Sequence, residues 1–240
     1  MRFRSHRLKL FTLIAGGLLL LAMTGGLLAD ALYPPFMGRL RDHSTLVLAA
    51  DDSVLRAFAT VDGAWRFPAQ SDAVDPKFLR YLKTFEDGRF GWHPGVDPLA
   101  VVRAGFQAML AGEVVSGAST LTMQTARLLE PRPRGLRAKA IEALRALQLT
   151  WRLGGEGVLR IYLTLAPYGG NLEGVRAASL GYFGKEPSHL TEAEAALLVV
   201  LPQSPERLRP DRFPAAAKRA RDKVLARLLE RMGHRVTAVG

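Results

Sequence analysis

An uncharged stretch of about twenty residues, from Leu10 to Ala29, constrains this chain more than any other feature. A run of that length can cross a hydrocarbon core of about 30 Å as a helix. Basic residues precede it, namely Arg2, Arg4, Arg7 and Lys9. By the positive-inside rule, the N-terminus is then expected in the cytoplasm and the remaining chain beyond the cytoplasmic membrane.

A cleaved signal peptide is the alternative interpretation of this run, with Ala29-Asp30-Ala31 as a weak small-x-small cleavage site. The apolar region of a signal peptide usually spans about 7–15 residues, and the run here is longer. An uncleaved membrane anchor is therefore the favoured prediction. Either way, the protein is expected to act outside the cytoplasm.

Length and charge set further bounds. The 240 residues allow one domain of fair size with appendages. The formal net charge of +11 indicates an anionic partner, such as nucleic acid, an anionic membrane or a phosphorylated ligand. Nucleic acid fits poorly with an exported domain. The absence of cysteine excludes disulfides and thiolate chemistry.

Short alternating runs after the anchor predict a small β-hairpin unit in residues 44–69. The runs are Thr45–Ala49 and Val54–Val61, and a turn signal at Asp62-Gly63 separates them from Trp65–Pro68. We expect this unit to form a stalk or collar.

Beyond this unit the apolar period becomes helical, which predicts a mainly α body without βαβ alternation. Asp75-Pro76 provides the N-cap and first residue of a helix that ends at Gly88. Further helices are expected from Ser119 or Thr120 to about Glu130, then over about Leu136–Leu153, Val158–Leu165, Glu173–Phe183, Glu192–Leu201 and Ala215–Met232. Thr191 and Glu194 form a capping box before the helix at Glu192.

One more helix is predicted to begin at Asp97-Pro98 and to end at Gly112. Its apolar residues recur at helical spacing and are expected to face inward: Leu99, Val102, Phe106 and Met109.

The segment Phe85–Gly95 concentrates ionisable side chains at the end of the first of these helices. Glu86 would be held firmly there while its carboxylate points out of the packed face, as a general acid or base requires. Arg89 and His93 follow within a turn and are placed to orient or balance it. A pair of solvated acids and a loop histidine are the plain structural alternatives.

The segment Gly117–Arg127 combines free backbone N–H groups at a helix start with several hydroxyl and amide side chains: Ser119, Thr120, Thr122 and Gln124. Such a helix start can bind an anion or sugar hydroxyls, whereas simple capping explains only one of these side chains.

Basic residues, including Arg127, Lys139 and Arg145, gather around the rigid linker Pro131–Gly135. A solvated basic face is the default interpretation, but on a membrane-tethered protein such a face also suits lipid headgroups or a pyrophosphate. The five histidines show no ligand spacing, so no metal site is predicted.

These ordered motifs resemble those of the peptidoglycan glycosyltransferases, glycosyltransferase family 51, which occur in class A penicillin-binding proteins and as monofunctional enzymes. The family's first motif is matched at Glu86, Asp87, Phe90, His93 and Gly95. Its second motif is matched at Gly117, Ser119, Thr120, Thr122, Gln124 and Arg127. In its third motif Lys139 and Glu142 are present, but Ala138 replaces an arginine.

Later segments are most similar to the 1C type of this family: Trp65–Pro68, Ala166–Gly170 and Leu201–Pro205. The resemblance extends from about Trp65 to Arg212. It implies a lysozyme-like fold with a smaller, membrane-dipping subdomain.

The resemblance also implies a reaction. Glu86 would be the general base that accepts the proton of the GlcNAc 4-hydroxyl of lipid II as it attacks the growing chain. Undecaprenyl pyrophosphate would leave, with inversion to a β-1,4 bond. The implied donor and pyrophosphate ligands are Arg89, Ser119, Thr120, Gln124, Arg127, Lys139 and Arg145. The implied structural or orienting residues are Asp87, Phe90, His93 and Gly95.

No cofactor is required under this resemblance, although a divalent cation, Mg or Mn, assists some members. The implied partners are lipid II, the growing glycan chain, the cytoplasmic membrane and a cell-wall synthesis complex, with no nucleic acid. The expected organisation is a basic cytoplasmic tail (1–9), a transmembrane anchor (10–29), a linker and hairpin collar (30–68), a glycosyltransferase domain (69–212) and a basic C-terminal helix (213–240).

Two departures from the family pattern stand out. Arg160 stands where the fourth motif commonly carries a second glutamate, which suggests the hypothesis that Arg160 contacts phosphate. After Arg212 there is room for one helix and no transpeptidase domain, so penicillin binding is not expected. The alternatives kept open are a truncated product, a lysozyme-like lytic muramidase, and a catalytically impaired lipid II-binding protein.

Overall fold

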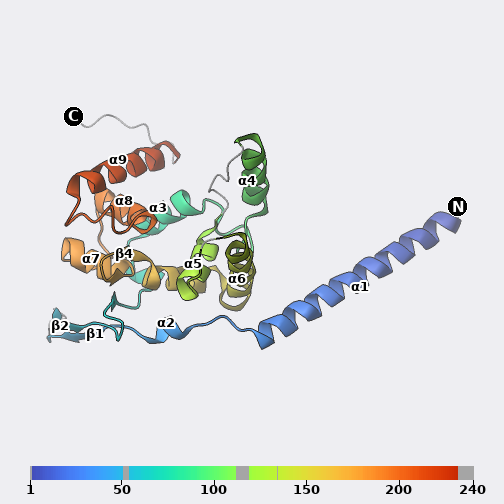
Figure 1. Ribbon diagram of the computed structural model, residues 1–240, viewed down its shortest axis with the longest axis horizontal. Coiled ribbons are helices and arrows are strands. Elements are labelled where there is room, and N and C mark those ends of the chain that lie inside the picture. The colour runs from blue at the N-terminus through green and yellow to red at the C-terminus, as the bar shows by residue number, and fades with distance from the viewer. Residues whose placement is uncertain (1, 51–53, 112–118, 134, 232–240) are drawn as a thin grey trace. The chain divides into compact units, whose positions relative to one another are not determined.

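A computed structural model of the protein describes residues 2–50, 54–111, 119–133 and 135–231. The chain divides into two compact units, one ending at Phe36 and one beginning at Met37. Helices make up most of both units (Figure 1). The mainly α class expected from the sequence is therefore confirmed.

The first unit is built on one helix, α1 (Arg2–Leu32), which contains the whole uncharged run. Thr24 bonds back along this helix, its hydroxyl donating to the carbonyl of Leu20 at 2.9 Å. Among the described residues, none of the helices combines the length and the apolar character needed to cross a membrane.

The second unit begins with a short helix, α2 (Gly38–Arg41), and the predicted hairpin. Strand β1 (Thr45–Leu48) pairs antiparallel with β2 (Val54–Phe58). The Asp62-Gly63 turn is also present, because Gly63 has φ +79° and its N–H donates to the carbonyl of Thr60 at 2.9 Å.

The strand after that turn departs from the expected collar. Strand β3 (Trp65–Arg66) leaves the hairpin and pairs in parallel with β5 (Leu172–Glu173). Strand β4 (Pro167–Gly169) completes this second sheet on the other side of β5. Neither β4 nor β5 was predicted, because strands of two or three residues are too short to show a period.

The helical body follows the predicted order closely (Figure 1). Its helices include α3 (Pro76–Glu86), α5 (Leu121–Leu129), α7 (Val175–Phe183), α8 (Glu192–Val200) and α9 (Pro214–Arg231), with short 3-10 turns η1 (Ser71–Ala73) and η2 (Leu201–Gln203). The caps predicted for two of them are present. Asp75 accepts from the N–H of Lys77 at 2.8 Å, and Thr191 and Glu194 form the capping box of α8.

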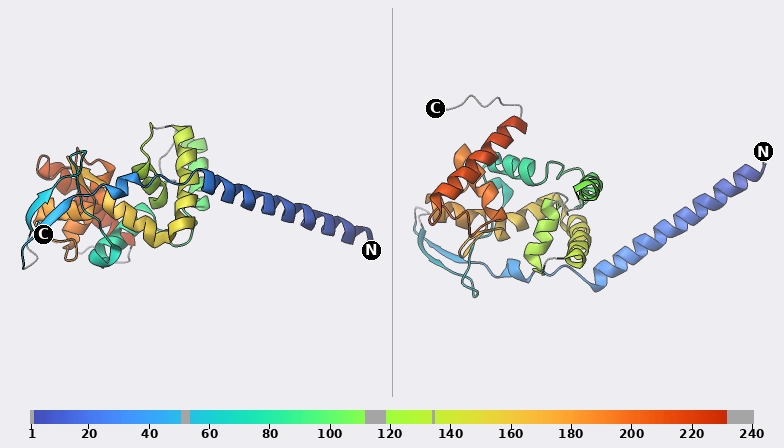
Figure 2. Two further views of the ribbon diagram at one scale, coloured as in Figure 1. Left: turned by 90° about the horizontal axis from the view of Figure 1, so that it is seen from below. Right: turned by 45° about the horizontal axis from the view of Figure 1, so that its top comes forward.

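Helix α6 (Leu136–Leu165) contains a sharp break at Gly154, where φ is +65° and ψ is 178°. The two helices predicted on either side of this glycine are therefore both present, joined by a bend (Figure 2). A residue with a side chain rarely adopts such backbone angles, so the glycine makes the bend possible.

Helix α4 (Pro98–Ala111) was placed correctly but faces the wrong way in the prediction. The four apolar residues expected to point inward are from 59% to 73% exposed: Leu99, Val102, Phe106 and Met109. Periodicity reveals that a helix has an apolar face but does not reveal what covers that face. Gly112, the predicted end of α4, lies outside the described residues.

Two apolar clusters hold the body together. The larger one joins α3, the second segment of α6, α7, α8 and α9, and includes the fully buried Phe78 and Leu198. The smaller one joins α5 to α6 through Leu129 and Leu149. Phe90 packs against both clusters, so the segment after α3 is fixed between them.

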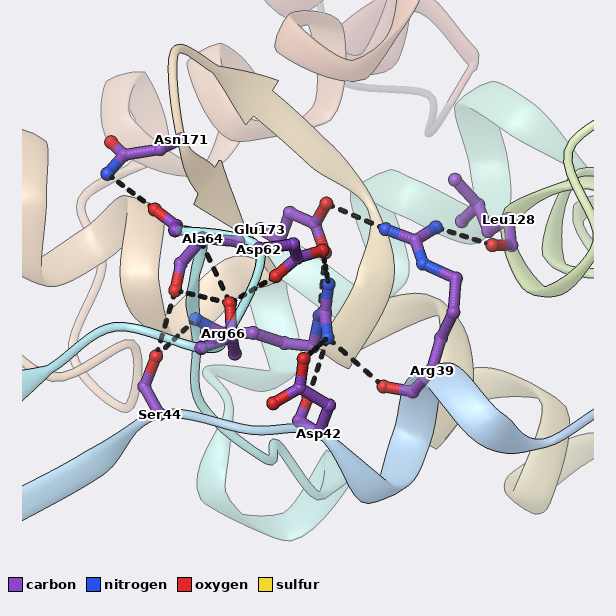
Figure 3. A network of polar contacts seen from close by, with 11 residues as sticks. Arg39, Asp42, Ser44, Asp62, Ala64, Arg66, Leu128, Asn171 and Glu173 are labelled. Atoms are coloured by element: carbon purple, nitrogen blue, oxygen red, sulfur yellow. Dashed lines mark hydrogen bonds and ion pairs between the residues drawn. The ribbon is translucent and has the colours of Figure 1, made fainter.

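A network of ion pairs attaches the N-terminal part of this unit to the body (Figure 3). Arg66 on β3 is 1% exposed, and its Nε donates to Glu173 on β5 at 2.7 Å. The same guanidinium contacts Asp62 at 3.3 Å and the carbonyl of Asp42 at 2.6 Å. Arg39 bonds Glu173 at 2.7 Å and also the carbonyl of Leu128 on α5 at 2.6 Å.

Candidate active site

The carboxylate of Glu86 is held between two amide side chains. Glu86 is the last residue of α3 and is partly exposed. Gln124 on α5 donates to Oε2 at 2.7 Å, and Gln203 at the end of η2 donates to Oε1 at 2.9 Å. Each carboxylate oxygen thus receives one hydrogen bond and keeps lone-pair capacity for another donor. This fixed, accessible carboxylate is suited to accept a proton.

Asp87 has a different role from its neighbour because it is 7% exposed. Its Oδ1 lies 2.9 Å from Nε2 of His93, and its Oδ2 accepts from the N–H of Leu121 at 2.9 Å. The N–H of Gly95 donates to Nδ1 of His93 at 3.2 Å, so the His93 proton is on Nε2, facing Asp87. Asp87 thereby ties the end of α3 to the start of α5.

Gly95 allows the turn after His93 to approach α6 closely. Its φ is +108°, and a Cβ there would lie 2.5 Å from the carbonyl oxygen of Ala146. Thr120 donates its hydroxyl to the carbonyl of Gly95 and accepts from the N–H of Met123 at 3.1 Å. Thr120 was expected to bind the glycosyl donor. In the structure it is buried and caps α5.

A cluster of cations lies beside α5. Glu142 on α6 is 5% exposed, and its two oxygens lie 3.9 Å from Arg127 and 3.7 Å from Lys139. Lys139 also donates to the hydroxyl of Ser119. The cations themselves remain partly open, with their side chains 43% and 41% exposed. A buried anion thus holds two accessible cations in place.

The pKa of Lys139 is lowered, first because the group is partly buried and then because Arg127 adds a positive charge; Glu142 opposes both effects. Burial of a cation favours its neutral form, and a nearby carboxylate favours the charged form. Glu142 therefore helps to keep Lys139 protonated.

The base and the cation cluster share one side of α5. Gln124 and Arg127 are three residues apart on that helix and so lie on the same face. Tyr162 on the second segment of α6 is fully buried, which raises the pKa of its hydroxyl, and the charge of Glu86 raises it further while Arg127 lowers it. The Tyr162 hydroxyl therefore lies within electrostatic reach of both. Among the described residues, the buried hydroxyls of Tyr162 and Tyr168 have no hydrogen-bond partner.

Two expected ligands of the pyrophosphate are paired with acids of the protein itself. Arg89 contacts Asp97 at 2.6 Å, and Asp97 also caps α4 by accepting from the N–H of Ala100 at 3.1 Å. Arg145 lies 3.3 Å from Glu130 and does not join the Glu142 pairs. The structure thus brings Arg127, Lys139 and Ser119 together and ties Arg89 and Arg145 to other partners.

Arg160 lies away from this cluster. It is exposed on α6 and two residues before Tyr162, so it projects about 200° around the helix from the residue near Glu86. One turn earlier, Glu156 contacts the hydroxyl of Ser71 in η1. The hypothesis that Arg160 contacts phosphate gains no support from this position.

Sequence reasoning missed the roles of two residues. Gln203 was noted only as part of a segment with a 1C-type resemblance, and Glu142 only as a motif match. Gln203 lies 117 positions from Glu86 along the chain, so no local pattern joins them. The i, i+3 spacing of Lys139 and Glu142 could have indicated an ion pair on a helix.

Metal donors do not gather in the described part of the chain, where no group of three or more His, Asp or Glu side chains could hold an ion. Gly117, part of the second motif, lies outside the described residues.

Comparison with known proteins places this geometry in context. A family model described as Transglycosylase matches residues 51–229. Penicillin-binding protein 1C of Escherichia coli (strain K12) is 46% identical over 217 residues, which cover 90% of this chain and 28% of that protein. Penicillin-binding protein 1A of Aquifex aeolicus (strain VF5) is 36% identical, with 75% of this chain and 25% of that protein covered.

A shorter relative is the biosynthetic peptidoglycan transglycosylase of Mesorhizobium japonicum. It is 34% identical over 184 residues, which cover 76% of this chain and 75% of that protein. The chain thus spans 28% and 25% of the length of the two penicillin-binding proteins that it matches.

Proposed function

Because the chain belongs to the transglycosylase family, we propose that it is a peptidoglycan glycosyltransferase that polymerises lipid II into β-1,4 glycan strands. The observation that carries this proposal is the carboxylate of Glu86, held by Gln124 and Gln203 on the same side of α5 as Arg127 and Lys139. A proton acceptor and a pyrophosphate site are the two parts that such a reaction needs.

Glu86 acts as the general base in the proposed mechanism. Its carboxylate takes the proton from the 4-hydroxyl of the acceptor GlcNAc as that oxygen forms a bond to the anomeric carbon of the donor MurNAc. The bond from that carbon to the pyrophosphate breaks at the same time, so an α-linked donor gives a β-linked product. The two amide donors keep the carboxylate oriented through this step.

The cation cluster stabilises the leaving group. As the glycosidic oxygen of undecaprenyl pyrophosphate gains negative charge, Arg127 and Lys139 offer charge-assisted hydrogen bonds, and Ser119 offers a hydroxyl. Glu142 fixes these cations before the substrate arrives. Because they are preorganised, little reorganisation is needed during the reaction.

Arg89, Arg145 and Thr120 were expected to bind the donor as well. We propose that Arg89 and Arg145 contribute less to this site than Arg127 and Lys139, because they pair with Asp97 and Glu130 and not with Glu142. Thr120 acts indirectly, by capping the helix that carries Gln124. Asp87, Phe90, His93 and Gly95 hold the end of α3 against α5 and α6.

The lipid part of the substrate fits the exposed apolar face of α4. Val102 and Met109 are 70% and 73% exposed, and Trp92 in the preceding loop is 89% exposed. Exposed apolar surface of this kind is typical of membrane or partner contact. We propose that α4 lies at the bilayer surface and receives the undecaprenyl chain, as the membrane-dipping subdomain of a lysozyme-like fold.

We propose further, from the sequence, that residues 10–29 anchor the chain in the cytoplasmic membrane with the N-terminus inside. Support comes from the uncharged run, the four preceding cations and exposed apolar side chains such as Leu18 and Leu21 on α1. Protease accessibility of tags at either end in intact and opened cells tests this topology. Participation in a cell-wall synthesis complex is also a proposal.

The test of the activity is polymerisation of lipid II by the full chain in detergent or vesicles. The expected result is a glycan polymer that a muramidase degrades, formed by the wild type and not by Glu86→Gln. If pre-formed glycan were shortened and no polymer formed, the chain would be a lytic muramidase. Binding of lipid II without turnover would make it a binding protein.

A further inference from the structure

We propose that Gln203 is a positioning residue, which fixes the carboxylate of Glu86 for proton abstraction. This inference rests on the proposed function of Glu86 as the base. It assigns a role to a residue that lies far from Glu86 in the sequence. Gln203 belongs to neither the first nor the second motif of the family.

The contact itself is specific. Nε2 of Gln203 lies 2.9 Å from Oε1 of Glu86, while Nε2 of Gln124 lies 2.7 Å from Oε2. The two donors reach the carboxylate from different elements, η2 and α5. With one donor on each oxygen, rotation of the carboxylate about its last bond is restricted from both sides. Loss of either donor would free that rotation.

The backbone that carries Gln203 is held firmly. Leu201, at the start of η2, is fully buried, and the N–H of Ser204 closes the turn on its carbonyl at 3.1 Å. The next residues press against β4, since a Cβ on Gly169 would lie 2.7 Å from the carbonyl oxygen of Pro205. A side chain on a backbone fixed in this way is well placed to orient another group.

The chemistry also favours an amide at this position. An uncharged N–H donor stabilises the carboxylate without pairing it to a cation, so the carboxylate keeps its capacity as a base. A lysine or arginine here would hold the carboxylate in an ion pair, and an aspartate or glutamate would compete for the same proton. Glutamine orients Glu86 with neither effect.

The experiment measures kcat, KM and the pH profile of lipid II polymerisation for Gln203→Met and Gln203→Glu beside the wild type. Gln203→Met removes the donor at similar volume, and we expect kcat to fall about tenfold with KM unchanged. The acidic limb of the profile should move to higher pH, because the carboxylate loses a donor that favours its ionised form.

Gln203→Glu should move that acidic limb further, by more than about one pH unit, because two adjacent carboxylates share a proton. Gln70→Met is the matched control, since Gln70 is an exposed glutamine outside the site. The control should keep the rate and the pH profile of the wild type. Thermal melting of each variant checks that the fold is intact.

The outcomes separate this inference from the proposed function. Glu86→Gln is assayed in parallel, and a wild-type rate for that variant would remove Glu86 as the base. If Glu86→Gln is inactive while both Gln203 variants keep the wild-type kcat and pH profile, only the role of Gln203 is overturned. A rise in KM alone would likewise overturn it, because Gln203 would then bind substrate instead of positioning Glu86.

Discussion

Two charged clusters in this molecule use the same side-chain types in opposite ways. In the network around Arg66, the guanidinium is 1% exposed and its donors bond Glu173, Asp62 and backbone carbonyls. In the cluster around Glu86, the residue is partly exposed and its carboxylate bonds neutral amides. The charge at the centre of the first cluster is buried and paired within the fold, and the second cluster keeps capacity for a substrate.

The difference teaches how to recognise a reactive charge in this fold. A buried, fully paired ion pair stabilises the position of two segments, and breaking it destabilises the protein. An accessible charge that is oriented by uncharged or buried partners contributes little to stability and remains available for chemistry. Changes in the two clusters should therefore separate stability from activity.

The largest expected effect is the loss of activity in Glu86→Gln. The amide cannot accept the proton, so kcat should fall by about 10²–10⁴-fold in the lipid II polymerisation assay. The melting temperature should stay close to that of the wild type, because the side chain is partly exposed and forms no ion pair with the described residues. A large drop in melting temperature would contradict the comparison, since Glu86 would then be part of the folding network.

Arg66→Met tests the other cluster. Removing the buried guanidinium should lower the free energy of unfolding by about 3 kcal/mol, at the lower end for a broken buried pair because Glu173 keeps Arg39 as a partner. Denaturant titration measures this loss. Activity per folded molecule should remain near that of the wild type, and a catalytic defect in fully folded protein would contradict the distinction.

Glu142→Gln sharpens the comparison, because Glu142 is buried like Arg66 but supports the reactive cluster. Its charge raises the pKa of Lys139 against burial and Arg127, so its removal should lower that pKa further. Lys139 would then lose its proton at a lower pH, and the basic limb of the kcat/KM profile should move to lower pH. At neutral pH we expect kcat/KM to fall about tenfold.

An unmoved basic limb in Glu142→Gln would show that Lys139 does not take part in the reaction as a cation. Lys139→Arg provides the control, because a guanidinium stays protonated over the whole pH range of the assay. This substitution should therefore abolish the pH dependence of the basic limb.

The smallest effect is expected for Arg39→Gln. Arg39 connects the Arg66 network to the helix of the Glu86 cluster. It bonds Glu173 on β5 and the carbonyl of Leu128 near the end of α5, the helix that carries Gln124. Its side chain is partly exposed, so the free energy of unfolding should fall by only about 1 kcal/mol. Activity should change less than about twofold, because a partly exposed ion pair contributes little to the position of α5. A larger loss would mean that the Arg66 network controls the position of α5.

Much of this architecture follows from local signals in the sequence. Asp75-Pro76, Thr191 with Glu194, and the glycine at 154 each mark a helix boundary, because caps and backbone preferences act within a few residues. The placement of Glu86 at the end of α3 follows from the same kind of signal. The residues that determine such features lie within a few positions of them, so a local pattern is enough to predict them.

Other features depend on contacts between distant segments and were not visible in the sequence. The pairing of Trp65 with Leu172 and the bond from Gln203 to Glu86 each join positions more than a hundred residues apart. The exposure of α4 belongs to the same class, because its apolar stripe says nothing about the surface opposite it. The burial and pairing of Arg66 also depend on the assembled fold.

The bend in α6 has a geometric consequence for the reaction. At the rise of an α-helix, an unbroken α6 would separate the Cα atoms of Lys139 and Tyr162 by about 34 Å. Instead, the charge of one residue, Arg127, acts on both of them. Gly154 therefore bends the helix, so that a single guanidinium lies within electrostatic reach of both of its arms.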